Sequence, residues 1–405
     1  MAIDAGADPQ TERWSILYYG RNSYSSNKGR WLTGLAVVFL GIALISGWLL
    51  VKNYKHFGNL FQVVSLVRNQ YLYKTDSTIM VDGAIKGIVE ALGDPYSVYL
   101  EPKTYSQLQE QIRGSFGGLG ILVGVKDDYL TVARTYQNTP AYEKGITAGD
   151  IITRIGERDA KGIDLETAVQ LMRGPVGTKV SLTLVRQGQG KPLVKVLTRR
   201  EISVPTVEAK MLPGNIGYII ISQFSEKTSE EIQRALGELK AGGLHGILLD
   251  LRDNPGGELQ SVVKVSGNFV PKGPVVYIEY RGGKTEELPA QGNNLRLPLV
   301  VLVNEGSASA AEILAGAIKD TRSGTLVGHK TFGKGVVQTV FELDNGAGLK
   351  LTTARYLTPG KHDINKKGII PDVEVGQDDP REKTDKQFDR GLEILKKIIK
   401  GKAAA

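Results

Sequence analysis

The sequence predicts a multidomain protein that combines the α/β and α+β fold classes. We expect an N-terminal transmembrane helix, a small helical segment, a compact β-rich module and an α/β domain with a mixed sheet and helices. Three observations support this prediction. An uncharged apolar run lies near the N-terminus, a stretch rich in glycine and β-branched residues follows, and strand-like and helix-like runs then alternate. A chain of 405 residues is also too long for one ordinary core.

The apolar run extends from Trp31 to Val51 without a charged residue. About 20 apolar residues cross the hydrocarbon core of a bilayer. Trp31 and Trp48 lie near the two ends, where interfacial anchors are found. One alternative is a cleaved signal peptide, but its apolar core is shorter and ends in small residues. The other is a buried core helix, which is rarely apolar over this length. Residues 31–51 are therefore predicted to be a transmembrane anchor.

The polar residues 1–30 are predicted to form a cytoplasmic tail. The charges around the apolar run slightly favour this orientation, because Arg21, Lys28 and Arg30 precede the run and only Lys52 and Lys55 follow it closely. We therefore expect a single-pass protein of the cell membrane, with its large C-terminal part on the extracytoplasmic side.

Two segments follow the anchor. Residues 52–105 have apolar side chains at helical spacing, and Asp76 or Ser77 can cap a helix that runs to about Leu92. Residues 106–204 alternate strand-like runs with turns from Gly114 onward, and contain one helical patch. This second segment has the size of a compact module of about 90 residues.

Residues 205–378 are predicted to form the α/β domain. Apolar strands such as IGYIIISQF, GILLDL, GPVVYIEY, PLVVLVN and TLVGHK alternate there with helices, which is typical of a sheet covered on both faces. Residues 379–405 are predicted to hold a C-terminal helix with a thin apolar stripe and a basic face. This helix could be a solvated surface, a dimer contact or a membrane-surface contact, and we favour the first interpretation.

Composition excludes several kinds of site. The chain has no cysteine, so thiolate nucleophiles, disulfides and cysteine-ligated metal sites cannot form. The four histidines are far apart in the sequence and have no metal-binding spacing: His56, His245, His329 and His362. We therefore expect no metal site built from histidine or cysteine. The net charge of +8 suits an anionic membrane surface, and no basic patch with interleaved aromatic residues indicates nucleic-acid binding.

The stretch GHKTFGKG, which ends at Gly335, resembles a phosphate-binding loop but lacks two of its features. Gly335 stands where the magnesium-binding Ser or Thr is needed, and β-branched alternation follows the loop where a helix is needed. Lys334 therefore requires another explanation.

A strand-to-helix junction upstream carries Ser307 and Ser309. A hydroxyl in such a place lies at a helix N-terminus, where free backbone N–H groups stabilise a developing oxyanion. Taken alone, either serine is more simply a helix cap. A second loop, LRDNPGGEL, ends another buried strand and exposes the amides of Gly256 and Gly257, although a plain turn explains it equally well. Together the two loops could supply a pair of oxyanion donors at adjacent strand ends.

A serine nucleophile needs a base, and no Ser-His-Asp pattern is evident. A lysine can serve when burial lowers the pKa of its amine. Lys334 has apolar and small neighbours that allow such burial, and the side chain of Gln338 could hold and orient the amine. In isolation, however, a lysine is usually a solvated surface residue.

Four motifs in this order, LLDLRDNPGGEL, VLVNEGSASAAEILAGAIKD, FGKGVVQ and KKGIIPDVEV, closely resemble those of the carboxy-terminal processing peptidases, or tail-specific proteases. The resemblance covers the chain from about Met80 to Val375. It implies an endopeptidase that cleaves proteins near their C-termini without a metal or cofactor. By this resemblance Ser309 is the nucleophile, Lys334 is the general base, and Gln338 orients the base. The oxyanion hole is formed by the amide of Ala310 together with that of Gly256 or Gly257. One departure is Tyr96, where many members have histidine.

The same resemblance identifies the module at 106–204 as a PDZ domain, which implies that it recognises the C-terminal tails of substrate proteins. PDZ domains add such a tail to a sheet edge and hold its carboxylate on backbone amides of a glycine-containing loop. Gly118, Leu119, Gly120 and Ile121 fit that loop, although a simple β-turn is the alternative. Arg173 is a candidate contact between the PDZ and protease domains, or else an exposed arginine.

The expected partners are protein substrates with accessible C-termini and the membrane, with a homo-oligomer possible and no nucleic acid. A rival function of another class is a membrane-tethered PDZ adaptor whose protease-like domain is catalytically silent. The intact Ser309 and Lys334 argue against the adaptor.

Overall fold

The computed structural model describes residues 37, 39–42, 58–126, 128–292, 294–376 and 384–403. The chain divides into two compact units, Met1–Gly83 and Ala84–Ala405. In the first unit, residues 58–70 are helical, and helix α2 (Ser77–Glu90) begins there and continues into the second. Asp76 accepts a hydrogen bond from the backbone N–H of Thr78 at 2.7 Å, which supports the predicted start of this helix.

The predicted transmembrane anchor at 31–51 lies outside the described residues except for residues 37 and 39–42. Among the residues that the structure describes, no helix has both the length and the apolar character needed to cross a membrane.

The β-rich module follows strand β1 (Val98–Leu100) and helix α3 (Pro102–Arg113). Its main sheet has the order β3-β4-β5-β7-β8, and β2 pairs separately with β9. The elements are β2 (Ser115–Gly118), β3 (Ile121–Lys126), β4 (Tyr129–Thr135), α4 (Pro140–Glu143), β5 (Ile151–Ile155), β6 (Arg158–Asp159), α5 (Leu165–Met172), β7 (Lys179–Val185), β8 (Leu193–Thr198) and β9 (Arg200–Ser203). Alternate side chains of the strands form one apolar core that includes Leu130, Ile152 and Leu182.

The α/β domain is built on a second sheet, of order β10-β11-β12-β15-β16-β19. Strand β10 is antiparallel to its neighbour and the others run parallel. The elements are β10 (Val207–Leu212), β11 (Ile216–Ile221), α6 (Thr228–Ala241), β12 (Gly246–Asp250), α7 (Leu259–Ser266), β15 (Leu299–Val303), α8 (Ala310–Asp320), β16 (Thr325–Gly328), β19 (Val373–Glu374) and α9 (Lys386–Ala403).

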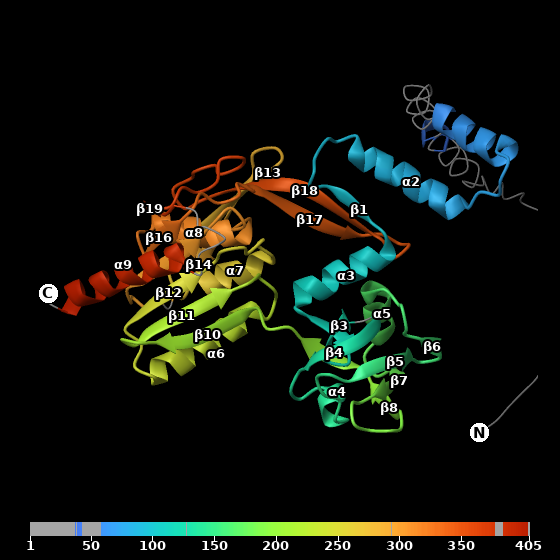
Figure 1. Ribbon diagram of the computed structural model, residues 1–405. Helices are drawn as coiled ribbons and strands as arrows, with labels where there is room; N and C mark the ends of the chain where they lie inside the picture. The colour runs from blue at the N-terminus through green and yellow to red at the C-terminus, as the bar shows by residue number, and fades with distance from the viewer. Residues whose placement is uncertain are drawn as a thin grey trace, which may run out of the picture. The chain divides into compact units, whose positions relative to one another are not determined.

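Continuous apolar runs form the central strands because both faces of this sheet are covered. Leu249 and Val301 point to the face covered by α6, α7 and α8. Leu248 and Val300 point to the opposite face, where they pack with Leu395 of α9, drawn in red in Figure 1. Our interpretation of the C-terminal helix as a solvated surface was therefore wrong. Its thin apolar stripe suffices because the neighbouring strands bring most of the apolar surface.

One predicted strand belongs elsewhere. GPVVYIEY forms β13 (Gly273–Tyr280), which lies in a separate antiparallel sheet of order β1-β18-β13-β14. The other members are β14 (Thr285–Ala290), β17 (Val336–Glu342) and β18 (Gly348–Leu357), and β17 pairs with β18. Apolar content could not distinguish β13 from the parallel strands, because one of its faces packs into the same core as α7 and α8.

The parallel strands bring their carboxyl ends to one edge of the sheet. Here β11, β12, β15 and β16 lead into the loops that contain Phe224, Gly256, Ser309 and Lys334, in that order. Residues separated along the chain therefore meet at this edge, as is usual for sites in α/β sheets.

We predict that Leu395→Ala lowers the free energy of unfolding by about 2–4 kcal/mol, because it leaves a cavity between α9 and the sheet. Ile370→Ala is the matched control, since Ile370 is 57% exposed and should change stability little. Denaturant unfolding measures both values. Equal small effects would show that α9 does not stabilise the sheet.

Candidate active site

Ser309 occupies the sharp turn between β15 and α8. Its backbone has φ 54° and ψ −114°, a conformation that a non-glycine residue adopts only when its surroundings enforce it. The Tyr356 hydroxyl donates to the carbonyl oxygen of Ser309 at 3.1 Å. Burial raises the pKa of Tyr356 well above its usual value, so this hydroxyl remains a donor. The turn therefore presents the Ser309 side chain from a rigid backbone.

Ser307 has a different role. It is fully buried, and its hydroxyl donates to the carbonyl oxygen of Leu251 at 2.7 Å while accepting from the N–H of Asn304 at 3.0 Å. These bonds connect the loops after β12 and β15. Ser307 therefore holds the loops together and is not available as a nucleophile.

The two glycines of the β12 loop differ in what their amides do. The N–H of Gly256 donates to the side-chain oxygen of Asn254 at 2.8 Å. Within the described residues, the N–H groups of Gly257 and Ala310 donate no hydrogen bond, and both residues line the same cavity as Ser309. A side chain at Gly257 would overlap the carbonyl oxygen of Phe224, which lies 1.9 Å from the position of its Cβ. Only glycine allows this approach.

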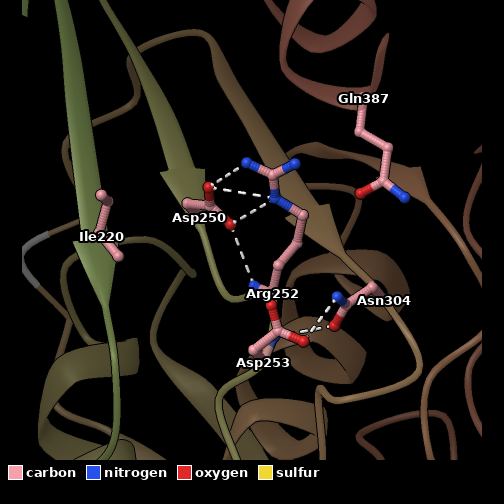
Figure 2. Close-up of a pocket in the computed structure, with 6 residues that line it drawn as sticks. All are labelled: Ile220, Asp250, Arg252, Asp253, Asn304 and Gln387. Carbon is pink, nitrogen blue, oxygen red and sulfur yellow. Dashed lines mark hydrogen bonds and ion pairs between the residues drawn. The ribbon is translucent and has the colours of Figure 1, made fainter. Parts of the chain in front are cut away.

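A network of polar side chains holds the loop that follows β12 (Figure 2). Arg252 bridges Asp250 and Asp385, with nitrogen to oxygen distances of 2.7 Å to each. Asn304 accepts from the N–H of Asp253 at 2.8 Å and donates to the Asp253 carboxylate at 2.9 Å. The network borders a polar cavity of about 390 Å³, into which Gln387 of α9 also projects. The loop is thus tied both to its neighbour and to α9.

Lys334 lies in the loop between β16 and β17 and is half-buried. Burial lowers the pKa of its amine, and the positive charge of Lys350 lowers it further, while Glu312 and Asp94 act in the opposite direction. Its Nζ atom lies 5.0 Å from the centre of the Tyr96 ring. Within the described residues, no hydrogen bond joins the Lys334 amine to the Ser309 hydroxyl. The two groups share one cavity but are not paired in this state.

Gln338 lies on β17 and lines this cavity. Its side-chain nitrogen donates to the Thr352 hydroxyl at 3.3 Å, so it is held by the neighbouring strand β18. The cavity has a volume of about 630 Å³ and is walled largely by apolar residues, including Leu108 and Ile112 of α3 and Ile278 of β13. The structure therefore brings together Ser309, Lys334, Gln338, Gly256, Gly257 and Ala310.

Glu312, which was not among the predicted site residues, is fully buried in the first turn of α8. One carboxylate oxygen accepts from the N–H of Ser309 and the N–H of Lys334, both at 2.9 Å. The other accepts from the Thr331 hydroxyl at 2.6 Å and the N–H of Gly333 at 2.8 Å. Glu312 thus binds the Ser309 turn to the Lys334 loop. The spacing Ser-x-x-Glu, typical of a capping box, was the available signal.

The predicted tail-binding residues lie between β2 and β3. Gly118 ends β2, Leu119 is buried, and Ile121 begins β3, which is an edge strand of its sheet. Gly120 has φ 76° and lies so close to Thr139 that a Cβ would overlap it.

Arg173, the candidate contact between domains, lies against β2 and α3. Its guanidinium is 3.9 Å from the centre of the Phe116 ring and 3.4 Å from the carboxylate of Glu110.

We predict that Glu312→Gln lowers the free energy of unfolding by about 2 kcal/mol or more, because an amide NH₂ would face buried N–H or O–H donors. Glu342→Gln, at an exposed position on β17, is the control and should be nearly neutral. Denaturant unfolding compares the two variants. A neutral Glu312→Gln would mean that the carboxylate does not hold the two loops.

The sequence matches the profile of Peptidase family S41 over residues 215–375, that of the PDZ domain over 107–185, and that of the activating protease CtpB N-terminal domain over 50–104. Carboxy-terminal processing protease CtpA of Bacillus subtilis is 38% identical over 355 residues, covering 85% of this chain and 76% of that protein. The carboxyl-terminal-processing protease of Synechocystis is 41% identical over 301 residues, covering 73% and 70%. Among solved structures, the photosystem II D1 C-terminal processing protease shares 32% identity with a TM-score of 0.47, covering 78% and 86%. The chain therefore belongs to the carboxy-terminal processing proteases of peptidase family S41, and is a serine-type peptidase with a PDZ domain.

Proposed function

We propose that this protease cleaves substrates near their C-termini with a Ser309–Lys334 dyad. The observation that carries the proposal is the shared cavity, which is lined by a strained serine at a helix N-terminus and by a half-buried lysine whose pKa is lowered by burial. In this mechanism Gln338 orients the amine once it has moved to Ser309, since it lines the cavity from the adjacent strand.

Catalysis proceeds through an acyl-enzyme. The Ser309 oxygen attacks the scissile carbonyl carbon while its proton passes to the neutral Lys334 amine. The new oxyanion accepts hydrogen bonds from the N–H groups of Ala310 and Gly257, because that of Gly256 already donates to Asn254. The C–N bond then breaks, and the Lys334 ammonium returns the proton to the leaving amine. Water, deprotonated by Lys334, releases the acyl group and restores Ser309.

The PDZ domain selects the substrate in this proposal. A C-terminal tail adds beside the edge strand β3, and its carboxylate binds backbone amides of the segment Gly118 to Ile121. Residues 31–51 anchor the protease in the cell membrane, with the catalytic part on the extracytoplasmic side. The uncharged sequence of this segment supports the anchor. Assembly into a homo-oligomer remains compatible with this arrangement.

The rival function, a catalytically silent PDZ adaptor tethered to the membrane, predicts binding of tails without cleavage. Incubation of the purified protein with a tagged peptide that ends in small apolar residues separates the two functions. Cleavage excludes the adaptor, and binding without cleavage excludes the protease mechanism.

We expect Ser309→Ala and Lys334→Arg each to reduce cleavage by about 100-fold or more. Arginine keeps its proton at any ordinary pH and cannot act as the base. Lys330→Arg, in the same loop but exposed, is the matched control and should cleave normally. Full proteolysis by Lys334→Arg would remove lysine from the mechanism.

The lowered pKa of Lys334 has a consequence for the pH profile. The base works only when it is neutral, so kcat/KM should rise with pH through the pKa of Lys334. Lys350→Met removes a positive charge that lowers this pKa, so the acidic limb should move to higher pH. Lys272→Met, at an exposed position before β13, should leave the limb in place. An unmoved limb in Lys350→Met would contradict this electrostatic role.

A further inference from the structure

The turn after α2 places an aromatic ring beside the proposed base. The backbone N–H of Tyr96 donates to the Asp94 carboxylate at 3.1 Å, and the hydroxyl of Ser97 donates to the same carboxylate. The Ser97 hydroxyl oxygen also accepts from the N–H of Thr352 on β18 at 3.0 Å. The next strand, β1, pairs with β18 as well. The position of Tyr96 is therefore fixed relative to the sheet that carries Gln338.

The amine of Lys334 lies within reach of a cation–π contact with this ring. The distance of 5.0 Å from Nζ to the ring centre is inside the range of about 6 Å over which the face of an aromatic ring attracts an ammonium group. Among the described residues, the amine has no hydrogen bond to the Ser309 hydroxyl. The ring thus contacts the amine in a state in which the dyad is not formed.

The Tyr96 ring favours the protonated form of the Lys334 amine, whereas reaction with the Ser309 hydroxyl requires the neutral form. The negative face of an aromatic ring stabilises the ammonium ion, whereas attack by Ser309 requires a neutral amine that accepts the hydroxyl proton. The charged groups around the amine come from three other places. Asp94 of the turn and Glu312 of α8 favour the ammonium, while Lys350 of β18 opposes it.

We propose that Tyr96 is a positioning residue for the base: its ring holds the Lys334 amine within the cavity that Lys334 shares with Ser309, so that the ring and the Ser309 hydroxyl compete for the amine. This proposal rests on the Ser309–Lys334 dyad proposed above. It concerns the face of the ring and not the phenolic hydroxyl. Tyr96→Phe should therefore behave as the parent protein does.

The test changes the electrostatics of the ring without changing its shape. Phenylalanine and a trifluorinated phenylalanine are introduced at position 96, because fluorination withdraws electron density from the ring face and weakens its attraction for a cation. On the acidic limb, kcat/KM of the fluorinated protein should exceed that of Tyr96→Phe by about 2- to 5-fold. On the alkaline plateau the two should agree. A purely structural role for the ring would leave the limb unmoved. Coinciding limbs, together with unchanged labelling of the Lys334 amine, would overturn the proposal.

A second measurement follows the amine itself. The Ser309→Ala protein is treated with an amine-reactive reagent over a range of pH, and mass spectrometry measures the extent of labelling of Lys334. This measurement does not depend on proteolysis. Labelling should begin at lower pH when the ring at position 96 is fluorinated. Unchanged labelling would overturn the role of Tyr96 whether or not the dyad is correct. Shifted labelling with an unshifted proteolysis limb would support Tyr96 and refute Lys334 as the base.

The chain offers a matched control for the labelling. Lys361 lies 5.4 Å from the centre of the Tyr277 ring, a comparable pair outside the catalytic cavity. Fluorination at position 277 should leave the labelling of Lys334 unchanged. If it moved the labelling of Lys334 as much as fluorination at position 96 does, the effect would be non-local and the proposal would fail.

Discussion

The buried carboxylate of Glu312 connects the two loops on which the candidate site depends. A carboxylate without partners would be costly to bury, so Glu312 requires the N–H groups that the Ser309 turn and the Lys334 loop supply. Those loops, in turn, would leave the same N–H groups unsatisfied without it. The positive φ of Ser309 is maintained under this constraint. The proposed nucleophile and the proposed base therefore share one backbone support, although their side chains are not paired.

A second constraint acts on the loop that follows β12. Arg252 is held between Asp250 and Asp385, and hydrogen bonds from Arg252 lower the pKa of Asp385 although burial alone would raise it. Asn304 and Ser307 extend the network to the loop after β15. As a result, the glycine amides and the serine turn are positioned by one set of polar contacts at the carboxyl edge of the sheet. Their relative geometry does not depend on apolar packing alone.

Much of this architecture was predictable because it follows from residue patterns within short segments of the sequence. Apolar runs identified the parallel strands, and the serine turn and the Asn-Pro-Gly-Gly loop identified the edge where the site residues meet. The predictions that were wrong or incomplete mostly concern contacts between residues far apart in the sequence. The apolar stripe of α9 looked too thin to be buried, since the sheet that completes its core lies far back in the sequence. Strand β13 resembled its parallel counterparts. The difference between Gly256 and Gly257 has a local cause, a hydrogen bond from the N–H of Gly256 to the side chain of Asn254, but the residue pattern of the loop does not say which amide makes it. Glu312 carried a capping signal, but its contacts with the Lys334 loop are long-range.

The position of α9 in the chain also affects synthesis. Leu395 packs on the face of the parallel sheet that includes Leu248 and Val300. The ribosome adds Leu395 long after it has added these strands. A nascent chain that has already made every proposed catalytic residue still exposes this apolar face to the surroundings. It also lacks Asp385, one of the two carboxylates that pair with Arg252 in the loop after β12. Helix α9 therefore couples folding of the candidate site to synthesis of residues 386–403.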